Sequence, residues 1–158
     1  MAARDDIGAG PWPLRAAIVL PLRGPAGLQL ALDVLTHLDA LTLANNPNIP
    51  PLYASGVRYA RESRLIGEGR EVPALDPVSG TVEERFNHLS RVLEIGAGDC
   101  DDLACWRAAE LQVRAGIPAR AVPVRSDTGW HVVVRLPDGS IDDPSARLGM
   151  YSIDGQRR

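Results

Sequence analysis

The strongest constraint on this chain is a cysteine placed at the start of a helix. Residues 98–102 read Gly-Asp-Cys-Asp-Asp and lead directly into the apolar, helix-forming run LACWRAAELQVRAG. The segments GWHVVV and IDDPS follow further along the chain. A cysteine that opens a helix, a histidine on the next strand and an aspartate beyond it are the groups that a thiolate nucleophile requires. The order of these segments therefore predicts a Cys–His–Asp acyl-transfer enzyme.

Cys100 is the candidate nucleophile. Unpaired backbone N–H groups and the helix dipole favour negative charge at a helix N-terminus, so they lower the pKa of a thiol there. The backbone amides of the first turn could also hold an oxyanion. The flanking Asp99, Asp101 and Asp102 argue against a buried apolar role for Cys100. Their charge opposes a thiolate, so we expect a cation close by, and His131 as imidazolium is the candidate.

His131 follows Gly129-Trp130 and precedes three valines, which places it at the start of a predicted buried strand. We expect it to act as general base and then as general acid. A third group must orient the imidazole. Side chains alternate along a strand, so only one of Asp142 and Asp143 can face the histidine. We choose Asp143, which precedes Pro144, and keep Asp142 as the alternative.

The spacing of apolar residues predicts three helices and an antiparallel sheet. In the first helix the predicted buried stripe is Leu28, Leu32, Leu35, Leu38 and Leu41. The helices are expected at 25–44, 81–95 and 99–115, and the strands at 15–22, 119–126, 129–137 and 140–145. A long ordered loop with a little strand near 56–61 is expected over 45–80.

Local signals set the ends of the later helices. Thr81 and Glu84 form a capping-box pattern at the start of the second helix, and Gly96 is expected to end it. The third helix should end at Ala115-Gly116. Cys105 lies inside that helix and points away from Cys100, so we expect two free thiols, with Cys105 serving in packing.

Composition limits the remaining classes. The chain has 158 residues, of which 45% are hydrophobic, so we expect a single domain over 1–158. A net charge of −3 gives no electrostatic footprint for nucleic acid. No stretch reaches the roughly 18 apolar residues of a membrane span. The first residues lack the basic segment and apolar run of a signal peptide, so we expect cytoplasmic synthesis. No cofactor is expected.

The three segments resemble the bacterial and phage branch of the transglutaminase-like superfamily. The resemblance rests on GAGDCDDLACWRAAELQVRAGIPAR at 96–120, on GWHVVV and on IDDPS, and it covers roughly 80–150. It implies a papain-like α+β core, in which the nucleophile helix packs on a small antiparallel sheet. Two additional N-terminal helices complete the core, and a strand, a helix and a long loop occupy 15–80.

The same resemblance implies that Cys100 is the nucleophile, His131 the base and Asp143 the orienting acid, with a peptide or protein amide as substrate. The upstream LYASGVRYARES is also similar to small members of this branch and is expected to form one wall of the cleft. The chain lacks the accessory domains of large transglutaminases. Calcium control and crosslinking of protein glutamines are therefore not implied.

Three functions remain open at this level. The first is cysteine-dependent acyl transfer, as a protease or amidase if water accepts the acyl group and as a transamidase if an amine does. The second is a non-catalytic phage or cell-envelope structural module, with a virion or another protein as partner and a virion-associated location. The third is metal binding by Asp99, Asp101, Asp102 and His131, although the glycine and terminal glutamate of an EF-hand loop are missing.

Overall fold

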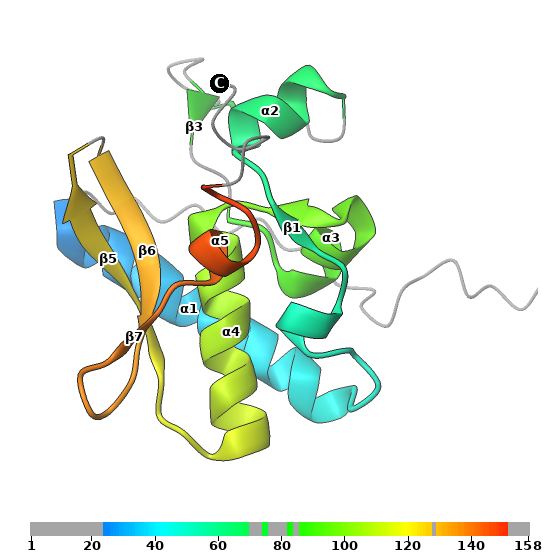
Figure 1. Cartoon of the computed structure of the whole chain (residues 1–158), viewed down its shortest axis with the longest axis vertical. Coiled ribbons are helices and arrows are strands. Elements are labelled where there is room, and N and C mark those ends of the chain that lie inside the picture. Colours follow the sequence, from blue (N-terminus) through cyan, green and yellow to red (C-terminus); the bar gives the residue numbers. More distant parts are fainter. Residues whose placement is uncertain (1–23, 70–73, 76–81, 84–85, 128, 152–158) are drawn as a thin grey trace, which may run out of the picture.

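A central helix, α4 (Cys100–Ala115), carries the candidate nucleophile and contacts most of the other elements. The structure is a computed structural model that describes residues 24–69, 74–75, 82–83, 86–127 and 129–151. The long helix α1 (Gly24–Asn45) crosses α4, and a three-stranded antiparallel sheet flanks both (Figure 1). Its strands are β5 (Arg120–Ser126), β6 (Gly129–Arg135) and β7 (Ile141–Asp142). The predicted α+β class is confirmed.

The helix predicted at 99–115 is confirmed, with its ends as expected. Asp101 and Asp102 lie in its first turn, where carboxylates complement the helix dipole. Gly116 ends it with φ 64°, a left-handed conformation that glycine adopts without steric cost. Ala104 and Ala108 are fully buried and let α1 and the sheet approach the helix axis closely. The helix is therefore buried on several faces, as a central core helix must be.

Two apolar clusters lie on either side of α4. The first joins α4 to α1, β5 and β6, and includes Leu32, Cys105 and Val132. The second joins α4 to the segment 43–59 and to α3 (Leu89–Ile95), and includes Leu52 and Trp106. Cys105 and Trp106 are completely buried, and Cys105 packs as predicted. Burial of apolar area on both sides is the main stabilising contribution to this arrangement.

The antiparallel sheet follows the predicted strand order. In the β5–β6 ladder Val124 pairs with His131, and in the β6–β7 ladder Val134 pairs with Asp142. Gly139, with φ 86°, forms the turn between β6 and β7. The last predicted strand is shorter than expected, because residues after Asp142 turn into the short helix α5 (Pro144–Arg147). The strand predicted at 15–22 lies outside the described residues.

The predicted first helix is confirmed, but its predicted buried stripe is wrong at two of its five positions. Leu32 and Leu35 are buried, whereas Leu38 and Leu41 are 41% and 50% exposed. The reason is geometric: successive steps of three residues fall short of a full turn, so Leu38 and Leu41 rotate progressively off the buried face. Asp39 and Leu43 occupy that face instead.

The second helix begins later than the capping-box pattern predicts. The structure has a strand, β3 (Val82–Glu83), where the helix was expected, and it pairs antiparallel with β2 (Ala74–Leu75). The helix α3 starts only at Leu89, and the side chain of its N-cap residue His88 accepts a hydrogen bond from the amide of Ser90. Antiparallel pairing with β2, seven to nine residues earlier in the chain, has replaced the helix start that the capping-box pattern indicated. The predicted end at Gly96 is confirmed.

The segment predicted as a long loop contains more structure than expected. It forms the 3-10 helix η1 (Leu52–Ala54), β1 (Arg58–Tyr59) and a second helix that was not predicted, α2 (Glu62–Gly67). The predicted strand near 56–61 is confirmed by β1. It pairs in parallel with β4 (Ala97–Gly98), which directly precedes the nucleophile segment. No helix among the described residues is long and apolar enough to span a membrane.

Candidate thiol site

Cys100 is the first residue of α4 and is partly buried between the two apolar clusters. Its position is fixed from the N-terminal side by β1, since the amide of Ala60 donates to the carbonyl of Gly98 at 2.9 Å. The neighbouring amide of Tyr59 donates to the carbonyl of Leu148, just after α5. The segment 58–60 therefore ties the strand before Cys100 to the chain that follows Asp143.

His131 and Asp143 are in direct contact. Nε2 of His131 lies 2.9 Å from Oδ2 of Asp143, and the two side chains are 12% and 26% exposed. The second oxygen of Asp143 accepts a hydrogen bond from the amide of Ala146 at 3.1 Å, so Asp143 is also the N-cap of α5. Both carboxylate oxygens are thus held, which fixes the plane of the carboxylate and with it the imidazole.

The packing of α4 places the three candidate residues on adjoining elements. The helix contacts both β6, which carries His131, and α5, which Asp143 caps. Figure 1 shows α5 beside the N-terminal part of α4. Because Nε2 of His131 engages Asp143, Nδ1 is the ring nitrogen that can exchange a proton with another group.

The choice between the two aspartates has a geometric answer. Asp142 does not serve His131: its oxygens accept hydrogen bonds from the Tyr53 hydroxyl at 2.6 Å and from Nε of Arg107 at 2.8 Å. Burial opposes ionisation of Asp142, but these two hydrogen bonds lower the pKa of its carboxyl below the usual value. Asp142 and Asp143 therefore face different partners, as alternation along an extended strand requires.

The three aspartates around Cys100 differ from expectation, because they lie inside the protein. Asp99, Asp101 and Asp102 are only 8%, 3% and 1% exposed. The acidic flanks are therefore no sign of solvent exposure, although Cys100 itself is only partly buried. Asp102 is satisfied by Asn87, whose amide and side chain donate to its two oxygens at 2.6 and 3.2 Å. A buried carboxylate is tolerated where such hydrogen bonds replace water.

Burial of these three aspartates changes the electrostatic environment of Cys100. It raises the pKa of all three carboxyl groups, and for Asp101 the neighbouring Asp99 and Asp102 charges raise the pKa further. Oδ1 of Asp101 lies 4.0 Å from the sulfur of Cys100. Carboxyl groups that retain protons oppose a nearby thiolate less than three full charges would. The raised pKa values of these carboxyl groups weaken the opposition to a thiolate that the sequence alone suggests.

The same carboxyl groups are the metal-ligating candidates within the described part of the chain. One oxygen from each of Asp99, Asp101 and Asp102 lies within 4.8 Å of the others. Oxygen donors of this kind suit a hard divalent cation. Asn87 already occupies both oxygens of Asp102, and His131 is bound to Asp143 and not to this cluster. The four-residue metal set considered from the sequence is therefore not assembled as a unit.

Gly98 has a packing role that the sequence did not reveal. A Cβ atom at this position would lie 3.1 Å from Cβ of Asp102 and 3.2 Å from Cγ1 of Val92. Such contacts are tighter than ordinary packing allows, so the missing side chain makes room for α4 to approach α3.

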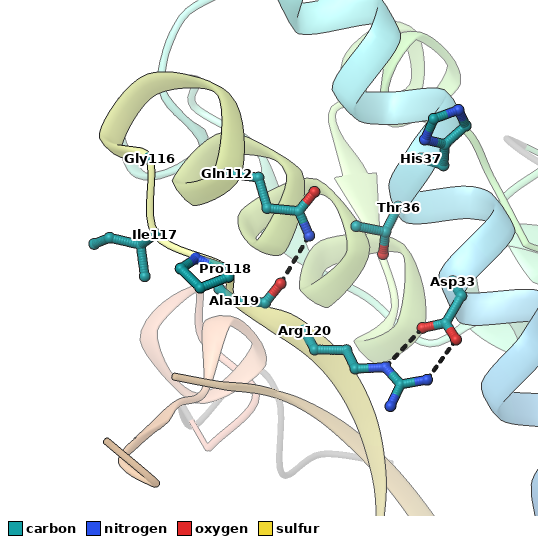
Figure 2. A pocket seen from close by; sticks show the side chains of 9 residues that line it. All are labelled: Asp33, Thr36, His37, Gln112, Gly116, Ile117, Pro118, Ala119 and Arg120. Carbon is teal, nitrogen blue, oxygen red and sulfur yellow. Dashed lines mark hydrogen bonds and ion pairs between the residues drawn. The ribbon is translucent and has the colours of Figure 1, made fainter. Parts of the chain in front are cut away.

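A cavity of about 580 Å³ lies at the other end of α4. Figure 2 shows Asp33 of α1 facing Arg120 of β5, and Gln112 of α4 facing Ala119. These polar groups are engaged with one another: Arg120 binds both oxygens of Asp33 at 3.0 and 2.6 Å, and Gln112 donates to the carbonyl of Ala119 at 2.7 Å. The lining contains no thiol. The cavity is separate from the candidate thiol site.

Sequence reasoning missed three residues that support the site: Asn87, Tyr53 and Arg107. Arg107 lies two helical turns after Cys100 in a helix that is otherwise largely buried, and a cation in such a helix signals a buried partner. Tyr53 lies within the segment that we expected to border the cleft. Asn87 had no local signal.

Comparisons with protein-family models, with curated proteins and with solved structures found no match for this chain.

Proposed function

We propose that this protein catalyses cysteine-dependent acyl transfer on amide bonds, with Cys100, His131 and Asp143 as the catalytic residues. The observation that carries the proposal is the 2.9 Å contact between Nε2 of His131 and Oδ2 of Asp143, on elements packed against the helix that Cys100 opens. An aspartate that holds the far nitrogen of an imidazole fixes its tautomer and stabilises its protonated form.

The proposed fold is a papain-like, transglutaminase-like core. Its support is the nucleophile helix at the centre of the structure, with the antiparallel hairpin that carries the histidine packed against it. The strand order β5-β6-β7 and the position of Asp143 directly after β7 fit the motif order from which the resemblance was drawn.

The chemistry follows from the two ring nitrogens. With Nε2–H donated to Asp143, Nδ1 accepts the proton of the Cys100 thiol, and the sulfur attacks the carbonyl carbon of an amide. Backbone amides at the start of α4 are the proposed donors to the resulting oxyanion. The protonated His131 then gives its proton to the departing nitrogen as the carbon–nitrogen bond breaks, which leaves a thioester on Cys100.

The second half-reaction reverses these roles. His131 takes a proton from water or from a primary amine, the oxygen or nitrogen attacks the thioester carbon, and the sulfur leaves and recovers a proton from His131. Water gives a protease or amidase, and an amine gives a transamidase. The proposed substrate is a peptide or protein amide. The 17 basic residues are all arginine, so this chain presents no lysine amine as an internal acceptor.

Selective alkylation tests the proposal. The protein is treated with iodoacetamide at about pH 6, where an ordinary thiol is almost fully protonated, and the label is located by mass spectrometry. We expect Cys100 to react and Cys105 to stay unlabelled, because Cys105 is fully buried and burial raises the pKa of its thiol well above the usual value. His131→Ala should abolish the reaction of Cys100 at this pH.

The chain offers a matched control. His37 is an exposed histidine of α1, so His37→Ala removes an imidazole without touching the site. Labelling of Cys100 should survive this change. Equal labelling of Cys100 in wild type and His131→Ala would overturn the proposal and favour a non-catalytic module.

A further inference from the structure

The mechanism proposed above leaves Asp142, the first aspartate of the Asp-Asp-Pro segment, unused, although it has the denser set of contacts. Asp142 accepts hydrogen bonds from Tyr53 at 2.6 Å, Arg107 at 2.8 Å and Arg147 at 3.5 Å. These donors come from η1, α4 and α5 respectively. One carboxylate therefore joins three elements that are distant in sequence. We refer to these four residues as the Asp142 clamp.

Two cations contact the aromatic ring of the clamp. The guanidinium of Arg147 lies 3.8 Å from the centroid of the Tyr53 ring, and that of Arg107 lies 4.8 Å from it. Contacts of this kind fix the ring as well as its hydroxyl. The Asp142 side chain is only 13% exposed, and Arg107 only 21%. A charge pair this well shielded, with added hydrogen bonds, holds its geometry better than a surface ion pair does.

The clamp acts where the backbone offers little rigidity. β7 has only two residues, and α5 has four. Asp143 lies between them. A two-residue ladder and a single helical turn do not by themselves fix a side chain to the tolerance that proton transfer requires. The best-anchored point next to Asp143 is the side chain of Asp142.

The clamp is also connected to the nucleophile. Arg107 lies two turns after Cys100 on α4, and its other nitrogen binds Glu110 on the same helix at 2.9 Å. Arg107 is therefore held on α4 while it binds Asp142. The Arg107–Asp142 ion pair and the rigid stretch of α4 from Cys100 to Arg107 therefore set the distance between the start of α4 and Asp142.

We propose that Tyr53, Arg107 and Asp142 are positioning residues that hold Asp143 against His131 and keep this pair in register with Cys100. This inference rests on the proposed function. None of the three residues is assigned contact with substrate. Their effect passes through the Asp143 carboxylate.

The test measures the rate of Cys100 alkylation against pH in variants of the clamp. Tyr53→Phe removes only the hydroxyl. Asp142→Asn removes the charge and replaces one acceptor oxygen with an NH2 donor. Arg107→Met removes the guanidinium at similar length. Each variant should lower the rate of Cys100 alkylation at about pH 6 by roughly fivefold to tenfold and shift the pH profile to higher pH. Arg107→Lys keeps a cation and should restore part of the loss.

A second measurement separates positioning from general loss of structure. The Nε2–H proton of His131, followed by nitrogen-15-edited NMR, should weaken through faster exchange in the clamp variants while the rest of the spectrum is retained. The matched control is the Asp33–Arg120 pair, an Arg–Asp ion pair at the distant cavity. Asp33→Asn and Arg120→Met should leave the pH profile of Cys100 alkylation unchanged.

The outcomes distinguish this inference from the proposed function. If Asp143→Asn lowers Cys100 alkylation but Tyr53→Phe, Asp142→Asn and Arg107→Met all keep the wild-type pH profile and the His131 proton signal, the positioning role is overturned and the thiol site stands. If wild-type Cys100 shows no reactivity that depends on His131, the proposed function fails and the positioning role fails with it.

Discussion

Asp143 holds His131 with one carboxylate oxygen, at 2.9 Å, and caps helix α5 with the other. The Asp143 side chain therefore both binds the imidazole of His131 and caps α5. Asp143→Asn keeps one oxygen, which can accept from the amide of Ala146, and then presents its uncharged NH2 group to the imidazole. We expect Cys100 alkylation at about pH 6 to fall by roughly tenfold or more, since the charge that stabilises the imidazolium is lost.

The capping role of Asp143 is measured separately, by comparing the stabilities of Asp143→Asn and Asp143→Ala. Asp143→Ala loses the cap as well, which should lower the free energy of unfolding by about 1 kcal/mol relative to Asp143→Asn. Urea denaturation of both variants measures this difference. Equal stability of the two would show that the cap contributes nothing.

The buried pair of Asp102 and Asn87 should be important for stability. Asp102 accepts two hydrogen bonds from Asn87, and both residues are buried. Asp102→Ala leaves the amide of Asn87 without its partner, so we expect a loss of about 2–3 kcal/mol in the free energy of unfolding. Chemical denaturation measures it. An exposed aspartate, Asp138→Ala in the β6–β7 turn, is the comparison and should cost much less.

Asp39 should make stability depend on pH in an unusual direction. It is fully buried, one oxygen accepts the amide of Leu89 at 2.9 Å, and the other has no hydrogen-bond partner among the described residues. Burial raises the pKa of Asp39 well above the usual value. The folded protein then binds a proton that the unfolded chain releases above about pH 4. This contribution to stability is present at low pH and is lost as the pH rises.

Asp39→Asn tests this dependence, because asparagine can accept the same hydrogen bond from Leu89 without titrating. The variant should gain stability relative to wild type as the pH increases from about 5 to 8, by up to about 1.4 kcal/mol per pH unit. Burial lowers the pKa of His88, whose Nε2 lies 3.4 Å from Oδ1 of Asp39, and the contribution of His88 to the pH dependence has the opposite sign. A stability difference that does not change with pH would contradict the expected protonation of Asp39.

Gly98→Ala should disturb the site through packing. The added methyl group would meet Asp102 and Val92 at 3.1–3.2 Å. We expect a loss of about 1–3 kcal/mol in the free energy of unfolding, typical of an overpacked core, together with slower alkylation of Cys100 as the start of α4 shifts. Gly67→Ala is the control, because a Cβ atom there meets nothing within 4 Å. Similar stability of Gly98→Ala and wild type would contradict the tight approach of α4.

Local sequence signals predicted the central helix and the hairpin beside it. The start at Cys100, the end at Gly116 and the strands on either side of the turn at Gly139 all follow from short-range chemistry: acidic residues in a first helical turn, left-handed glycines, and runs of β-branched residues. The motif order also placed a histidine and an aspartate on adjacent strands: β6 carries His131 and β7 carries Asp142, whereas Asp143 lies one residue beyond β7.

Tertiary structure decided what such signals cannot encode. Pairing of β2 with β3 replaced a predicted helix start. The packing of α1 on its neighbours buried Asp39 and Leu43 and left Leu38 and Leu41 exposed. The burial of Asp101 and Asp102 and the separate partners of Asp142 and Asp143 also depend on residues far away in the chain. A hydrogen-bond partner or an apolar neighbour from a distant segment leaves no trace in the local pattern. The sequence therefore determined which groups this protein carries, and the fold decided which of them meet.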